Sequence, residues 1–344
     1  MTTEAVLQPA EWAPHDAVWL AWPSHEELWK FALPEARRSF TALCRAIARD
    51  GGERLEILAP DGVEETVARA ALHGLDARYH QIPFGDIWVR DTAPVFMHGA
   101  DGAVVAARFA FNGWGGKYVL RYDDAVGDAV AKASGFRTVR HDLVLEGGSI
   151  EVDGEGTVLS SRQCLLNPNR NPDLGEEAIT RAVLDAYGGT RMLWVTDGLI
   201  NDHTDGHIDT IARFVAPGVI ALMEPSGGDD PNRDILLRLR DELTGQRDAL
   251  GRPIELVFVP SPGRVEDDDG RVMPASHLNF YIGNRTVVVP TYGTPWDDAA
   301  ARAVERLFPG RHVEPIDALA ILEGGGAFHC ITQQQPTRRK HAAP

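Results

Sequence analysis

The alternation of apolar and polar positions divides the chain into modules, and each module predicts a β-hairpin, an amphipathic helix and one further strand. The hairpin strands are rich in valine and isoleucine, and glycine stands at their turns, as is typical of short hairpins. Acidic residues occur in the first turn of each predicted helix, where they favour a helix N-terminus. The four hairpins span residues 94–109, 149–163, 210–225 and 279–293, and the helices that follow them span residues 123–133, 174–187, 231–243 and 296–308.

A near-regular spacing supports this division. The second-strand valines of the four hairpins are 54, 61 and 68 residues apart, at Val104, Val158, Val219 and Val287. A fifth module is split between the chain ends, with its front part at residues 17–23, 34–49 and 54–60 and its back part at 328–336. Modules of this length repeat around an axis or along a solenoid, and pairing of the two ends would close a ring. We therefore expect one α/β domain over residues 1–336, followed by a disordered tail at 337–344.

Charge and cysteine content limit the classes of function and the compartment that we expect. The formal net charge of −16 repels phosphate backbones, so nucleic-acid binding is not expected. The same charge would attract a cationic ligand, although it could equally serve solubility alone. No apolar run reaches the length of a membrane span, and residues 1–12 lack the features of a signal peptide. Three widely spaced cysteines favour free thiols in a reducing compartment, so we expect a cytoplasmic protein.

Polar residues that folding does not require stand just before the first strand of each hairpin. Asp91 precedes the first hairpin, Glu146 the second, His207 and Asp209 the third, and Asn279 the fourth. If the modules surround an axis, these side chains converge on it. His207 and Asp209 are two residues apart on a segment expected to be extended, so both side chains should point to the same side.

Cys330 is the candidate nucleophile. It follows three glycines at residues 324–326, which permit close approach of a ligand to the backbone. A cysteine becomes reactive when electropositive surroundings or a cationic ligand lower the pKa of its thiol. The neighbouring His329 would face the opposite way in a strand. The other two cysteines, Cys44 and Cys164, are expected to be buried and inert.

Two of the carboxylates predict a site for a planar cation. Asp91 and Asp209 together could hold a guanidinium, and each charge-assisted hydrogen bond of this kind contributes about 1.5–3 kcal/mol. The alternative for Asp91 is an ion pair with Arg90 or a turn cap. The alternative for Glu146 is a solvated position before a Gly-Gly turn.

Tryptophans are candidates for contact with the apolar part of such a ligand. Trp88 stands three residues before Asp91, and Trp114 lies in the glycine-rich segment 111–118. This segment is either a mobile flap over the site or an ordinary loop. We expect no metal: His203 and His207 have the i,i+4 spacing of a metal-binding helix, but the residues between them favour a turn and no further ligand set follows.

These segments resemble the agmatine deiminases of the guanidine-modifying pentein superfamily. The resemblance extends over nearly the whole chain and rests on PAEWAPHDAVWLAWP, WVRDTAP, EGGSIEVDGEGTVL, QCLLNPNRNP, TDGHIDTIARFV, LNFYIGN and GGGAFHCITQQQP. It implies a five-bladed β/α-propeller. It also implies hydrolysis of agmatine to N-carbamoylputrescine and ammonia through a covalent cysteine intermediate, without metal or cofactor.

The resemblance also implies roles for individual residues. Cys330 is similar to the nucleophile, His207 to the general acid/base, Asp91 and Asp209 to the guanidinium-binding carboxylates, and Glu146 to the residue that positions the histidine or the substrate nitrogens. The chain departs from the usual pattern at Ala93, where glycine is usual, at Thr210, where asparagine is frequent, and at Ala327 and Phe328, where Asn-Ile is common. None of these departures removes a catalytic group.

Other functions stay open at this point. The departures leave room for a deiminase or amidinotransferase of the same fold that acts on another guanidine, such as free or peptide-terminal arginine. A propeller that binds cations without catalysis is the alternative from another class. The sequence does not decide the oligomeric state, a homo-oligomer included.

Overall fold

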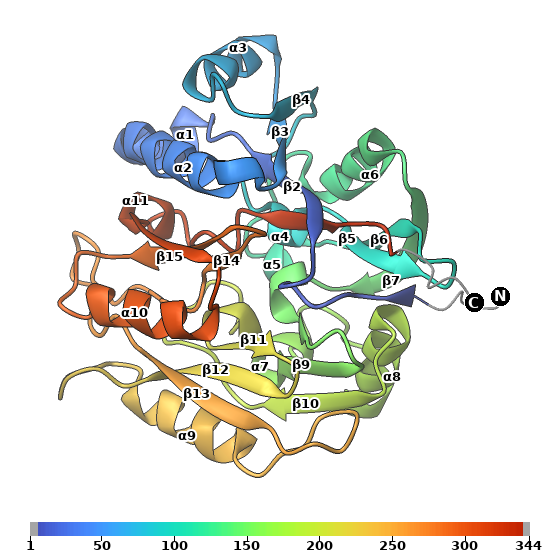
Figure 1. The fold of residues 1–344 in the computed structure, drawn as a ribbon, viewed down its shortest axis with the longest axis vertical. Helices are drawn as coiled ribbons and strands as arrows, with labels where there is room; N and C mark the ends of the chain where they lie inside the picture. The colour runs from blue at the N-terminus through green and yellow to red at the C-terminus, as the bar shows by residue number, and fades with distance from the viewer. Residues whose placement is uncertain (1–5, 340–344) are drawn as a thin grey trace.

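The computed structural model describes residues 6–339 and has a mixed α/β architecture. Its strands form five separate sheets. Four of them each contain a hairpin and a parallel strand, and the fifth combines β17, near the end of the chain, with strands near its start. Figure 1 shows the sheets following one another around the molecule in chain order, from blue through green and yellow to red. The predicted α/β class is confirmed, and the sheets match the predicted modules.

The four complete modules share one topology. In each, two strands pair directly and the third pairs in parallel with the second, after a helix that carries the chain back to the starting edge. The strands are β5 (Val95–Gly99), β6 (Val104–Ala110) and β7 (Arg137–Val144); β8 (Glu151–Val152), β9 (Thr157–Ser161) and β10 (Arg191–Val195); β11 (Ala212–Ala216), β12 (Val219–Glu224) and β13 (Glu255–Pro260); and β14 (Tyr281–Ile282), β15 (Thr286–Thr291) and β16 (His312–Asp317). The return helices are α6 (Asp123–Ser134), α8 (Glu176–Tyr187), α9 (Arg233–Leu243) and α10 (Asp297–Leu307).

The fifth sheet joins the two ends of the chain, as the split module predicts. The strand β17 (Gln333–Pro336) pairs antiparallel with β2 (His15–Ala21), and Gln333 lies opposite Trp19. On its other side β2 pairs in parallel with β3 (Arg54–Ala59), after the helix α2 (Leu33–Ile47). This sheet also has a second helix and strand that were not predicted, the helix α3 (Gly62–Ala71) and the edge strand β4 (Ala77–Gln81).

The chain ends are tied to the body of the protein. The short strand β1 (Val6–Leu7) pairs with β5. Beyond β17, the backbone N–H of Thr337 donates to the carbonyl of Pro14 (2.8 Å), and that of Arg339 donates to the carbonyl of Gly102 (3.0 Å). These hydrogen bonds connect residues 337–339 of the predicted tail to the body of the protein, and the rest of that tail, 340–344, lies outside the described residues.

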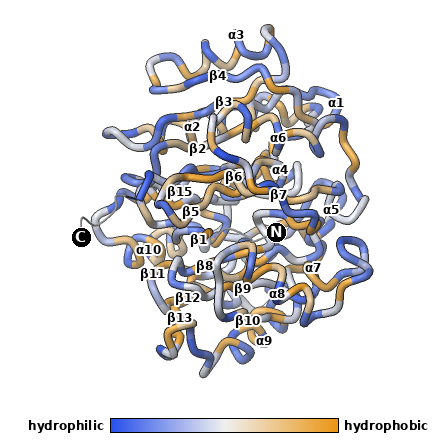
Figure 2. Tube along the Cα trace, turned by 90° about the vertical axis from the view of Figure 1, so that its right-hand side faces the viewer, coloured by the Kyte–Doolittle hydropathy of each residue, from blue (hydrophilic) through white to orange (hydrophobic). Residues whose placement is uncertain are grey.

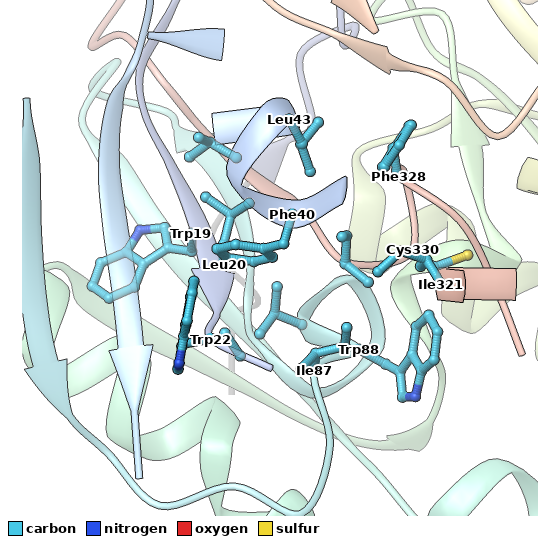
Figure 3. Packing of buried hydrophobic residues seen from close by; sticks show 14 of the residues in the cluster. Trp19, Leu20, Trp22, Phe40, Leu43, Ile87, Trp88, Ile321, Phe328 and Cys330 are labelled. Carbon is cyan, nitrogen blue, oxygen red and sulfur yellow. The ribbon is translucent and has the colours of Figure 1, made fainter. Parts of the chain in front are cut away.

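Apolar side chains of the strands and of the inner helix faces form the core. The largest cluster contains Trp22 and Phe40, whose rings meet edge to face where α2 packs near the end of β2 (Figure 3), and Trp19, which stacks on Phe96 of β5. In Figure 2 the hydrophobic stretches follow the strands inside the molecule, and hydrophilic stretches mark much of its periphery. Among residues 6–339, no helix has the length and hydrophobicity that a bilayer crossing requires.

Short helical turns occupy the connections between these larger elements. Four of them, α4 (Val89–Thr92), α5 (Gly113–Gly116), η3 (Gly147–Ser149) and η4 (Ile208–Thr210), carry or adjoin the predicted site residues. The others are α1 (Glu26–Trp29), η1 (Lys30–Ala32), η2 (Arg49–Gly51), α7 (Arg162–Leu165) and α11 (Leu319–Leu322).

Candidate active site

The predicted polar residues converge on one buried point, which Gly148 marks. A Cβ at Gly148 would lie 2.6 Å from His207 Nδ1, 3.1 Å from Asp209 Oδ2 and 3.1 Å from Asp91 Oδ1. These three side chains come from η4 and α4, which belong to different modules. Only glycine leaves the space that they fill, because any side chain would collide with the imidazole.

Cys330 lies in the turn that leads into β17, and its thiol is buried beside Asp209. Its Sγ is 3.7 Å from Asp209 Oδ2 and accepts a hydrogen bond from Asn279 Nδ2 (3.2 Å). Asn279 Oδ1 also accepts from the backbone N–H of Cys330 (3.3 Å), so one amide fixes both the thiol and its backbone. Burial raises the pKa of the thiol well above its usual value, and the charges of Asp209 and Asp91 raise it further.

His207 is a buried imidazole between carboxylates. Its Nδ1 lies 3.8 Å from Asp91 Oδ2, and its Nε2 lies 3.7 Å from Glu146 Oε2. Neither ring nitrogen has a hydrogen-bond partner among the described residues, which leaves both free for a ligand or water. Burial alone would lower the pKa of His207, but Asp91, Cys164 and Glu146 together raise it well above its usual value.

The backbone conformation of the segment that follows His207 differs from the prediction. The segment after His207 is a 3-10 turn, Ile208–Thr210, rather than an extended strand. His207 and Asp209 still reach the same point, because that turn brings both side chains beside Gly148. The predicted convergence holds, but the reason given for it is wrong.

Asp91 has no ion pair with Arg90 among the described residues. Asp91 Oδ1 accepts from the N–H of Gly148 (2.9 Å) and Oδ2 accepts from Trp114 Nε1 (2.9 Å). The Arg90 guanidinium instead donates to the carbonyl of His329 (3.2 Å) and to Gln334 Oε1 (2.7 Å). Burial raises the pKa of Asp91; the charge of His207 opposes this shift, and Asp209 and Glu146 add to it.

Asp209 holds His329 with the same oxygen that lies near the Cys330 sulfur, and its other oxygen has no partner among the described residues. Its Oδ2 lies 2.6 Å from His329 Nδ1, whereas Oδ1 is buried without a partner in the described part of the chain. Burial would raise the pKa of Asp209, but the hydrogen bond and charge of His329 lower it overall. An ionised carboxylate with one free oxygen can accept an N–H from a cation.

His329 does not face away from the site as predicted, because its segment is a turn and not a strand. Its second ring nitrogen, Nε2, lies 2.8 Å from Glu11 Oε2. Glu11 in turn accepts from Arg213 Nη2 (2.7 Å), and Arg213 also bonds Glu151. These buried charges are thus connected to Asp209 through His329. Glu11, Glu151 and Arg213 were not predicted as site residues.

Glu146 is buried, so the solvated alternative for it is wrong. Its Oε1 accepts from Arg170 Nε (3.1 Å), and the side chains of both residues are inaccessible to solvent. Arg170 also bonds Asp205 and donates to the carbonyl of Thr204 (2.8 Å), in the turn before His207. Burial would raise the pKa of Glu146, but His207 and Arg170 lower it overall. The sequence analysis missed Arg170, although it lies in the quoted QCLLNPNRNP segment.

A cavity of about 480 Å³ leads to this point from the surface. Cys330 and Asp91 lie in its wall together with both predicted tryptophans, Trp88 and Trp114. Trp114 has a positive φ of 52° within α5, the only helical turn of the glycine-rich segment, where it reaches Asp91. Four of the seven predicted site residues thus line the cavity. The other three, His207, Asp209 and Glu146, are buried next to Asp91 or to one another.

Two groups of side chains have the ligand types that a metal would need. One group is Glu146, Cys164 and His207, and the other is Glu11, Glu151 and His329. In both groups an arginine already pairs with the carboxylates, Arg170 in the first and Arg213 in the second. Neither group joins His203 to His207. Cys164 is buried, as expected, but it lies beside Glu146 (4.0 Å).

Fold and site together define a class of protein. It is a mixed α/β protein of repeated hairpin modules that brings a thiol, an imidazole and three carboxylates close together, and the thiol and one of the carboxylates line a cavity. Such a set is suited to covalent catalysis on a planar cation.

The comparisons with known proteins identify the family. The family model for the Porphyromonas-type peptidyl-arginine deiminase matches residues 7–336. The agmatine deiminase of Pseudomonas aeruginosa (strain LESB58) is 37% identical over 360 residues, covering 96% of each chain. The chain therefore belongs to the Porphyromonas-type peptidyl-arginine deiminase family.

Solved structures agree with this assignment. The agmatine deiminase of Enterococcus faecalis, solved while catalysing its reaction, superposes with a TM-score of 0.91 at 29% identity and covers 97% of each chain. A cysteine-to-serine variant of the C. jejuni agmatine deiminase with substrate bound superposes with a TM-score of 0.89 at 26% identity, covering 99% of each chain.

Proposed function

We propose that this protein hydrolyses agmatine to N-carbamoylputrescine and ammonia. The observation that carries the proposal is the meeting of the Cys330 thiol, the unpartnered His207 imidazole and the carboxylates of Asp91 and Asp209 at one buried point. The relatives named agmatine deiminase, similar over nearly the whole chain, support agmatine as the guanidine.

In the first step the Cys330 sulfur attacks the guanidinium carbon. Asp91 and Asp209 hold the planar cation for this attack, the free Oδ1 of Asp209 accepting one of its N–H groups. The bound positive charge offsets the two carboxylates that raise the pKa of the thiol, so the substrate itself favours the thiolate. The thiol proton leaves to solvent as the cation binds. The C–S bond then forms, and the C–N bond breaks as the protonated His207 gives its proton to the departing ammonia.

In the second step water hydrolyses the S-alkylthiouronium. His207, now neutral, takes one proton from the water that attacks the same carbon and so becomes protonated again. The C–S bond breaks, the ureido product forms and the second water proton goes to the sulfur. Glu146 positions His207 from its Nε2 side. Trp88 and Trp114 enclose the chain of the substrate and exclude water.

We also infer the wider properties that the sequence predicts. The five sheets would be the blades of one closed five-bladed propeller, a single catalytic domain that uses no metal or cofactor. Free thiols at all three cysteines support a cytoplasmic location. A small cationic guanidine would be the partner, rather than nucleic acid or membrane, and a homo-oligomer is compatible with the site.

A second candidate substrate is arginine, free or at a peptide terminus. The description of the matching family, a peptidyl-arginine deiminase, favours testing it. The chemistry would be the same, because both molecules carry the same guanidinium group. In a binding protein without catalysis, the thiol of Cys330 and the imidazole of His207 would have no role.

The test measures ammonia and ureido product from agmatine, arginine and a peptide with C-terminal arginine. We expect turnover of agmatine that Cys330→Ala lowers by at least about 10⁴-fold while the fold survives, since covalent catalysis is lost. Turnover of another guanidine alone would keep the chemistry and change the substrate. Equal activity of wild type and Cys330→Ala would refute the mechanism.

A further inference from the structure

Asp86 is a carboxylate in the cavity wall to which the reaction gives no role. It is 9% exposed and lines the same cavity as Cys330 and Trp88. Its Oδ1 accepts from Trp29 Nε1 (3.2 Å) and from the backbone N–H of Ile87 (2.8 Å), and its Oδ2 accepts from Trp88 Nε1 (2.8 Å). Within residues 6–339 no cationic side chain forms an ion pair with it.

A buried carboxylate without a counter-charge costs folding free energy. Burial raises the pKa of Asp86, although its N–H donors and His25 lower it in part. The neighbouring carboxyl of Asp123 is also negative when ionised, and its own pKa is raised to about 7. A cation that entered the cavity would supply the missing opposite charge.

The Trp88 indole connects Asp86 with the reactive thiol. A Cβ at Gly326 would lie 2.8 Å from Trp88 Cζ3 and 3.0 Å from Cys330 Sγ, so the benzo edge of the ring faces the sulfur. The indole nitrogen at the other end of the ring holds Asp86. Figure 3 shows this orientation, with the nitrogen of Trp88 directed away from Cys330.

Agmatine has its two charges in the same arrangement. Its guanidinium and its ammonium stand at opposite ends of an apolar four-carbon chain. When the guanidinium is at Cys330, the carbon chain can pack along the flat indole of Trp88, and the ammonium reaches the end of the ring that Asp86 occupies.

The other carboxylates of the cavity are less suited to this role. Asp268 and Glu323 also line it, but both are exposed, so water screens their charge. Asp91 is already assigned to the guanidinium. Asp86 is therefore the buried carboxylate of the wall that remains for a second positive charge.

We propose that Asp86 binds the distal ammonium of the substrate and selects guanidines that carry a cation, and no carboxylate, at their far end. The inference rests on the proposed function. It also predicts discrimination against arginine, whose α-carboxylate would meet the carboxylate of Asp86.

The experiment compares kcat/KM for agmatine, n-butylguanidine and arginine in wild type and in Asp86→Asn. n-Butylguanidine has the same guanidinium and four carbons but no ammonium. We expect Asp86→Asn to lower kcat/KM for agmatine about 10- to 100-fold, mainly through KM, because one charge-assisted hydrogen bond is lost. Turnover of n-butylguanidine should stay within about threefold, and the preference for agmatine over arginine should shrink.

Two control variants separate charge from packing. Glu323→Gln removes an exposed carboxylate of the same cavity, and Trp29→Phe removes an indole donor but keeps the Asp86 charge. Both should keep the wild-type preference for agmatine over n-butylguanidine. Equal losses on both guanidines in Asp86→Asn, or loss of the preference in either control, would overturn the role of Asp86. If wild type hydrolysed neither guanidine, the proposed function itself would be wrong and the subsite with it.

Discussion

At the residue scale, the site is a balance of buried charges. The carboxylates near His207 and Cys330 have opposite effects on the two groups. Asp91 and Glu146 raise the pKa of the imidazole, which favours its cation. Asp91 and Asp209 raise the pKa of the thiol, which disfavours its anion. Without substrate the protein therefore keeps both groups protonated near neutral pH. A guanidinium ion between the aspartates reverses the balance for the thiol.

This balance predicts the pH dependence of thiol reactivity. In Asp209→Asn, a negative charge 3.7 Å from Sγ is lost, so the pKa of Cys330 should fall. The rate of alkylation by iodoacetamide, measured against pH without substrate, should then rise at lower pH than in wild type, by about one pH unit or more.

Cys44 makes an internal control for the same measurement. It is a buried thiol in α2, part of the apolar core, and its alkylation should not respond to Asp209→Asn. Mass spectrometry distinguishes the two sites. An alkylation profile of Cys330 that moved to higher pH in the variant would contradict the assigned electrostatics.

At the scale of elements, the site depends on side chains that tie separate turns together. Arg170 connects Glu146, at the start of η3, with the turn at residues 202–206 that leads to His207. Lys117, which follows α5, bonds Asp205 of the same turn (2.7 Å). The segments around the cavity are thus joined by ion pairs in addition to the core.

We expect Arg170→Met to reduce both stability and turnover. It leaves the Glu146 carboxylate buried without its counter-ion, which costs about 3–5 kcal/mol of unfolding free energy. The proton affinity of Glu146 should rise, so the pH profile of kcat should also change. Urea denaturation and kinetics on the same preparation measure the two effects.

Arg162→Met is the matched control. Arg162 pairs with Glu176 (3.0 Å), but both side chains are about half exposed, so its loss should cost no more than about 1 kcal/mol and leave kinetics unchanged. Equal effects of the two substitutions would show that burial of the Arg170–Glu146 pair has no special importance.

At the scale of the whole molecule, the last strand holds the first module in place. The glutamines of β17 are buried: Gln335 Oε1 accepts from Trp19 Nε1 (3.2 Å), and Gln333 and Gln334 accept from Arg90. Cys330 precedes this strand directly. The position of the thiol therefore depends on the pairing of the two chain ends.

Truncation at two points tests this dependence. Removal of residues 333–344 should abolish cooperative thermal unfolding, because it exposes an edge of β2 and leaves the buried Arg90 without its two glutamine acceptors. Removal of residues 340–344 alone should leave the melting temperature and activity unchanged. Circular dichroism against temperature decides between these outcomes. A stable fold without β17 would show that the protein does not need the pairing of its two chain ends.

The repeat, the helices and the strands could be predicted because they depend on local patterns. Hydrophobic periodicity and glycine turns recur in every module, and the four return helices lie within a few residues of their predicted positions. Identification of Cys330, His207 and the carboxylates rested on residue type at equivalent places in the modules. Arg170 and Glu11 were not predicted, because nothing in their local sequence distinguishes a buried arginine or glutamate from a solvated one.

What the sequence determined by itself was the order of elements in the four complete modules, the α/β class, the family resemblance and the candidates for the reactive groups. The tertiary structure alone decided the buried partners: Arg170 for Glu146, His329 for Asp209, and two indoles for Asp86. The physical reason is that periodicity is a property of neighbouring residues, whereas burial and charge pairing arise only when segments far apart in the chain meet. Ionisation of the site depends on those meetings, so its chemistry could be named from the sequence but not its charge balance.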